Sequence, residues 1–146
     1  LVLMLSVPAS LQNGLASASL LALSLVVGVI HNRALKNGPL SFVGWCVTFA
    51  LLVPFITFGM WGMGNEPLSL DFPAEQAPSL LALLAAAALG LAIHLATAIP
   101  HLDQDKRSEI NTLPVLIASR LGSRGLAFLA GTLASVSTLV LIWVAL

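Results

Sequence analysis

Long apolar stretches separated by short polar segments dominate the chain, and they predict helices that cross a membrane. Four uncharged stretches approach the roughly 20 residues needed to span the hydrocarbon core of a bilayer. They cover about 15–30, 40–63, 79–99 and 125–146. A shorter apolar stub opens the chain, and Pro8 with the polar turn at 12–14 separates it from the first full span. The pattern predicts an all-α fold, a transmembrane helix bundle of four full spans plus a stub over residues 1–146.

Proline and small residues add detail to the spans. Pro54 lies inside the second span and predicts a kink, which membrane helices tolerate when neighbours satisfy the freed carbonyl. Small residues spaced four apart let helices approach closely. Such residues are Ala86 and Gly90 in the third span, and Ala127, Gly131 and Ser135 in the fourth. We therefore expect these faces to pack on other helices.

All six basic residues fall in two of the three loops, and this distribution predicts an orientation. Arg33 and Lys36 lie between the first two spans, and Lys106, Arg107, Arg120 and Arg124 lie between the last two. The remaining loop holds only the acidic residues Glu66, Asp71 and Glu75. Because basic residues concentrate in cytoplasmic loops, we expect both basic loops on the cytoplasmic side.

The overall composition agrees with an integral membrane protein. Hydrophobic residues make up 58% of the chain and charged residues 8%, whereas a soluble domain carries about 25% charged residues. This excludes a soluble domain, a disordered chain and a nucleic-acid binder, and makes the lipid bilayer the expected surroundings. We interpret the chain as a piece of a longer polytopic protein, since apolar sequence reaches both ends without a basic leader or a polar tail.

The segment 99–122 carries the groups best suited to chemistry. If the third helix continues through Pro100, then His94, Thr97, His101 and Asp105 share one face, with Asp103 beside it or off it. Closely spaced carboxylates suit Mg²⁺, which takes oxygen ligands and bridges carboxylates to substrate phosphates. The neighbouring Lys106 and Arg107 would balance the remaining phosphate charge. The combination indicates a Mg²⁺-diphosphate site, although spacing alone favours a solvated loop whose basic residues only set the topology.

His94 lies inside the third span, where an ionisable side chain has two interpretations. It lines a functional pocket, or it is a neutral histidine bonded to a neighbouring helix. The sequence leaves both open. Cys46 is expected to be a packing residue, and as the one cysteine it forms no internal disulfide.

The order of residues in the two basic loops resembles the UbiA family of intramembrane prenyltransferases. After His94, Thr97 and Pro100 comes Asp105, four residues beyond position 101, followed by Asn-Thr-Leu-Pro-Val at 111–115 and Arg-Leu-Gly at 120–122. This order is similar to the second aspartate-rich motif of the family, an Asp-x-x-x-Asp pair with a basic stretch and a Thr-Leu-Pro-Val-Arg-Leu-Gly-like ending. The first loop, His-Asn-Arg-Ala-Leu-Lys at 31–36, resembles the segment where a family helix ends in Tyr and a nearby Lys.

The resemblance implies an enzyme that moves a prenyl chain from an isoprenyl diphosphate to a membrane-accessible acceptor, an aromatic ring or a lipid alcohol. It implies a bundle of about nine helices, of which this chain would supply the end of the third and the fourth to seventh. By this resemblance, Asp105 matches a Mg²⁺ ligand of the family. Lys36 and Arg33 would be the basic residues near the diphosphate, and Lys106 and Arg107 would form the basic stretch after the aspartate pair. His94, Thr97 and His31 would line the pocket.

Four departures from the family pattern bear on the chemistry. His101 replaces the first Asp of the pair, and a neutral imidazole is a poor Mg²⁺ ligand, although a protonated one could contact the diphosphate directly. Asp103 would then supply the second carboxylate by a shift in the loop. Thr97 stands in place of Asn, His31 in place of Tyr, and residues 116–119 form an insertion.

Other functions stay open on the sequence. A degenerate, non-catalytic membrane protein or a transporter fragment would use the charged loop for topology and His94 to line a pathway. An alcohol phosphotransferase ranks lower, because the Asp-Gly and Ala-Arg elements of that family are missing.

Overall fold

Four long apolar helices form the framework of the protein. The computed structural model describes residues 11–62 and 77–146, and all regular structure in these ranges is helical. The long helices are α2 (Leu15–Ile30), α3 (Ser41–Gly62), α4 (Leu80–Ala98) and α6 (Leu113–Ala145). With α2 counted through the π-turn to Leu35, each is long and apolar enough to cross a membrane, so the predicted all-α class with four possible spans is confirmed. The stub at 1–10, the acidic residues Glu66, Asp71 and Glu75, and the side chain of Trp61 lie outside the described residues.

Local sequence explains where the helices begin. Gly14, with φ of 101°, precedes α2 and closes the predicted polar turn in a conformation that glycine adopts without a steric penalty. Ser79 precedes α4, and its Oγ accepts a hydrogen bond from the N–H of Ala82 at 3.1 Å, a side-chain N-cap. Pro54 lies inside α3, which continues through it.

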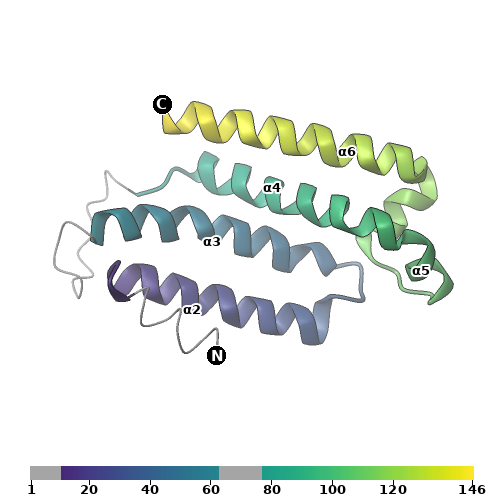
Figure 1. The fold of residues 1–146 in the computed structure, drawn as a ribbon, viewed down its shortest axis with the longest axis horizontal. Coiled ribbons are helices and arrows are strands. Elements are labelled where there is room, and N and C mark those ends of the chain that lie inside the picture. Colours follow the sequence, from purple (N-terminus) through teal and green to yellow (C-terminus); the bar gives the residue numbers. More distant parts are fainter. Residues whose placement is uncertain (1–10, 63–76) are drawn as a thin grey trace.

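The long helices lie side by side in one layer in the order α2, α3, α4, α6 (Figure 1). Among the long helices, α2 packs on α3, α3 on α4 and α4 on α6, so the described chain forms an open layer. Most side chains of α2, α3 and α6 remain unburied, and α4 has the largest share of buried side chains. In a bilayer this exposed apolar surface would face lipid or further helices.

A buried hydrophobic cluster joins α4, α5 and α6 at the end where the layer carries its charged residues. It contains Leu95, Leu102, Val115, Ala118, Leu126 and Ala130. Leu102 belongs to the short helix α5 (Leu102–Arg107) and is 4% exposed. Because this leucine is buried, the cluster holds α5 and its two aspartates against the beginning of α6.

Two helix boundaries differ from the sequence prediction. A 3-10 turn at Ile99–His101 follows α4, so the uninterrupted helix assumed for the face from His94 to Asp105 is not present. Pro100 accounts for the turn, because it has no N–H to donate and disfavours helical geometry in the residue before it. The last helix begins at Leu113, well before the predicted residue 125, and breaks at Gly122, where φ is 71° and ψ 172°.

The prediction of helix packing by small residues is met in one span. Ala86 is buried, and a Cβ on Gly90 would lie 2.5 Å from the carbonyl oxygen of Trp45, so α3 and α4 are in close contact there. On α6 the residues Ala127, Gly131 and Ser135 are exposed. That stripe packs on no helix of the described chain.

Candidate functional site

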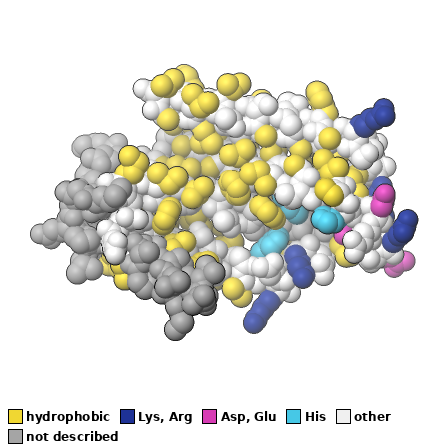
Figure 2. All heavy atoms as spheres, viewed as in Figure 1, with side chains coloured by type: hydrophobic (Ala, Val, Ile, Leu, Met, Phe, Trp, Pro, Cys, Tyr) yellow, Lys and Arg dark blue, Asp and Glu magenta, His cyan; other side chains and the backbone are white. Residues whose placement is uncertain are grey.

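Both basic loops lie at the same end of the layer. The turn between α2 and α3 and the helix α5 lie together at one end in Figure 1, opposite the end where α3 finishes. Figure 2 shows the basic and acidic side chains gathered there, with histidine side chains between them and the apolar body. Residues separated by some 70 positions in the sequence are thus brought to one rim.

A π-turn forms the polar end of α2. His31–Leu35 adopts π-helical geometry, and the N–H of Lys36 donates to the carbonyl of His31 at 2.9 Å. A π-turn adds one residue to a helical turn, so residues five apart stand above one another, and such turns recur at functional sites. This geometry brings Lys36 onto the side of the helix that carries His31. Arg33 and Lys36 are both exposed.

The aspartates lie on α5. Asp103 is exposed and Asp105 is half-buried, both in the first turn, while Lys106 and Arg107 are exposed in the last turn. The chain reverses directly afterwards, and the carbonyl of Asp105 accepts from the N–H of Ile110 at 3.0 Å. His101, in the preceding 3-10 turn, is exposed. The described residues contain no group of three or more His, Cys, Asp or Glu side chains placed to hold a metal ion.

His94 is hydrogen-bonded to a neighbouring helix, which is one of the two interpretations that the sequence left open. Its Nε2 lies 3.1 Å from the hydroxyl of Ser41, the first residue of α3, and both side chains are buried. The ring of His94 also lies 6.0 Å from that of Trp45, centre to centre. Thr97 is exposed and donates its hydroxyl to the backbone carbonyl of His94. The His94 side chain therefore joins the start of α3 to α4.

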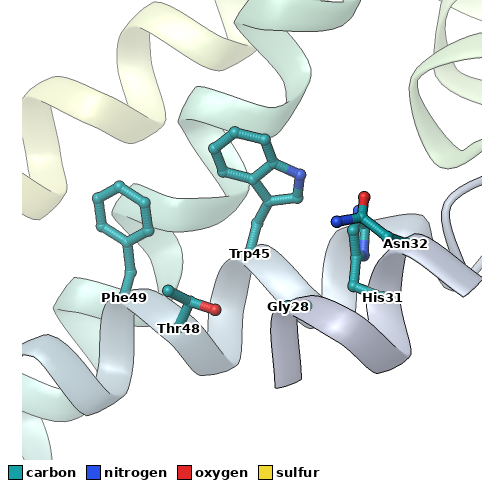
Figure 3. Close-up of a pocket in the computed structure, with 7 residues that line it drawn as sticks. Gly28, His31, Asn32, Trp45, Thr48 and Phe49 are labelled. Atoms are coloured by element: carbon teal, nitrogen blue, oxygen red, sulfur yellow. The ribbon is translucent and has the colours of Figure 1, made fainter. Parts of the chain in front are cut away.

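A cavity of about 290 Å³ opens between the polar end of α2 and the first turns of α3 (Figure 3). Its lining consists of Gly28, His31, Asn32, Gly44, Trp45, Thr48 and Phe49. Trp45 and Phe49, one turn apart on α3, project to the same side, and His31 and Asn32 project from the end of α2. None of the lining side chains carries a fixed charge.

The imidazole of His31 is held against α3. A Cβ on Gly44 would lie 2.5 Å from its Nδ1, and this nitrogen is buried without a hydrogen-bond partner. Because Gly44 has no side chain, the ring can occupy this place. Of the three predicted pocket residues, His31 therefore lines the cavity, His94 packs behind Trp45, and Thr97 lies outside the cavity lining.

Several residues at this site were not among the candidates from sequence. Asn32, Gly44, Trp45 and Thr48 line the cavity, and Ser41 pairs with His94. The spacing of Gly44 with Thr48 and of Trp45 with Phe49, four residues each, was an available signal for one helix face.

Comparison of the chain with protein-family models, curated proteins and solved structures finds no match.

Proposed function

We propose that the protein is a UbiA-like prenyltransferase that transfers an isoprenyl group from its diphosphate to an acceptor within the membrane. The observation that supports this proposal most is that both charged loops share one end of the helical layer. Lys36, Arg33 and the α5 residues can then face one ligand, beside a cavity that opens into the apolar body. A bundle of about nine helices, with further helices covering the open layer, belongs to the same proposal.

The chemistry follows from the movement of charge. The carbon–oxygen bond of the allylic diphosphate breaks, its electron pair leaves with the diphosphate, and the carbon carries a positive charge until the acceptor attacks. The acceptor forms the new bond to that carbon and loses a proton. Asp105 would supply a carboxylate from α5 to Mg²⁺, with Asp103, two residues away, projecting from another side of the helix, and the ion would neutralise the developing negative charge on the leaving group.

The residues of this chain supply the other parts of the reaction. Arg33, Lys36, Lys106 and Arg107 are fixed cations that can bind diphosphate oxygens. His101, if protonated, would add a further donor. The cavity offers Trp45, whose ring face can attract a cation.

Binding of geranylgeranyl diphosphate with and without Mg²⁺ tests the proposal. We expect Mg²⁺-dependent binding that Lys36→Ala and Asp105→Ala each weaken by roughly tenfold or more, the loss of one charge-assisted contact. Glu75→Ala, in the acidic sequence between the second and third predicted spans, is the control and should bind as the wild type does. A degenerate or transport protein predicts no Mg²⁺-dependent binding, and that result would reject the enzyme.

The same proposal places the charged end on the cytoplasmic side, as expected from its basic residues. In a Cys46→Ser background, single cysteines at Asn37 and Ser108 should react with an impermeant maleimide from one side of sealed vesicles. A cysteine at Ala77 should react only from the other. All three native residues are exposed. Labelling of all three from one side would rule out the topology.

A further inference from the structure

Two cavities between α2 and α3 adjoin, and together we call them the α2–α3 groove. The first is the cavity beside His31 described above. The second, of about 180 Å³, lies further along the same helices and is lined by Leu21, Ser24, Thr48, Phe49, Leu52 and Phe55. Thr48 and Phe49 line both cavities, so the two cavities adjoin along α2 and α3, from the π-turn toward the middle of the span.

The groove is polar at one end only. His31 and Asn32 line the end of the groove beside the π-turn. The exposed cations Arg33 and Lys36 follow immediately beyond that end. Its other end is aliphatic and aromatic apart from the hydroxyls of Ser24 and Thr48, and it carries no ionisable side chain. From His31 to Leu21 the helix rises about 15 Å at 1.5 Å per residue. This shape and polarity suit a long apolar chain with an anionic head group.

Gly28 provides space at the polar end of the groove, beside His31. A Cβ built on Gly28 meets no atom within 4 Å, so the absent side chain leaves room instead of permitting close packing. The contrast with Gly44 is informative, because a Cβ there would collide with the His31 ring. A larger residue at position 28 can therefore fill the groove without displacing either helix.

We infer that the α2–α3 groove binds the hydrocarbon chain of the isoprenyl diphosphate, with the diphosphate end toward Lys36 and the chain running past Trp45 and Phe49. This inference rests on the proposed function and adds to it the path of the donor chain. Aromatic side chains line both cavities of the groove. Trp45 and Phe49 line the cavity at the polar end, and Phe55 lines the apolar cavity. Flat aromatic faces pack well on the planar double bonds of an isoprenoid chain.

The experiment uses Trp45 as the reporter. Trp61→Phe and Trp143→Phe leave Trp45 as the one tryptophan of the chain, and its fluorescence is titrated in detergent with Mg²⁺ and three probes. The probes are inorganic pyrophosphate, dimethylallyl diphosphate and geranylgeranyl diphosphate. We expect the long-chain diphosphate to bind about tenfold or more tightly than the short one, because it buries more apolar surface.

Gly28→Leu and Gly131→Leu form a matched pair, because a Cβ at either glycine meets no atom within 4 Å. Gly28→Leu should abolish the higher affinity for the long-chain diphosphate and leave the affinity for pyrophosphate unchanged. Gly131→Leu, on α6 and outside the groove, should keep the full gain. Circular dichroism and thermal unfolding of both variants confirm that they fold.

Three outcomes overturn the inference. The first is an undiminished long-chain gain in Gly28→Leu. The second is displacement of geranylgeranyl diphosphate by an equal concentration of a saturated lysophosphatidic acid, which would make the groove a general lipid site. The third is a wild type that binds pyrophosphate and geranylgeranyl diphosphate with equal affinity, which leaves the proposed function intact. If the wild type binds no diphosphate with Mg²⁺, the proposed function itself fails.

Discussion

The contact between α3 and α4 at Gly90 allows a sharp test of the helical layer. A Cβ at this position would lie 2.5 Å from the carbonyl oxygen and 2.9 Å from the carbonyl carbon of Trp45, both backbone atoms that cannot rotate away. Gly90→Ala must therefore push the two helices apart. Overpacking of this kind costs about 1–3 kcal/mol. The intrinsic preference of a helix for alanine over glycine, about 1 kcal/mol, offsets part of this loss.

Gly131→Ala is the control, because a Cβ there meets no atom within 4 Å and only the propensity gain remains. The assay is reversible unfolding in mixed micelles, followed by circular dichroism and the emission of Trp45. We expect Gly90→Ala to be less stable than the wild type and Gly131→Ala to be equally or more stable. If both substitutions shift the free energy of unfolding equally, α3 and α4 do not approach closely at Gly90.

Three further substitutions test other contacts by the same unfolding assay. Ser41→Ala leaves Nε2 of buried His94 without its partner and should cost about 1 kcal/mol, with the double variant Ser41→Ala/His94→Leu recovering part of the loss. Gly44→Ala should destabilise the wild type by crowding the His31 ring, yet cost little in a His31→Ala background, where the crowded ring is gone. Gly122→Ala should lower the free energy of unfolding by about 1–3 kcal/mol, because φ of 71° with ψ of 172° is a conformation that only glycine adopts readily. An unchanged free energy of unfolding would mean that the helix does not break at Gly122.

The sequence was sufficient to locate the first three spans, whose ends carry clear signals, but not the start of the last helix at Leu113. Gly14 and Ser79 mark helix starts, and the charged loops interrupt apolar runs that are otherwise continuous. The arrangement of the spans could not be predicted in the same way. A membrane helix is apolar on its lipid-facing and its helix-facing sides alike, so no periodicity distinguishes the face of α4 that meets α3 from the exposed faces of α6.

The candidate site was predicted in part. The basic residues and aspartates at one rim follow from the alternation of loops across a membrane, which the sequence displays directly. The pairing of His94 with Ser41, 53 residues apart, depends on how α3 and α4 pack, and so does the cavity beside Trp45. The π-turn at His31–Leu35 has no strong signature in composition, and its effect on the placement of Lys36 appears only in the backbone hydrogen bond to His31.

We propose that the two basic loops bind one diphosphate, and a double-variant cycle between Lys36 and Asp105 tests this directly. Pyrophosphate affinity in saturating Mg²⁺ is determined for the wild type, Lys36→Ala, Asp105→Ala and the double variant. We predict that both single variants bind more weakly and that their effects are coupled by about 0.5 kcal/mol or more, as for residues in one charged network. Fully additive effects, or no effect of either substitution, would contradict a shared diphosphate.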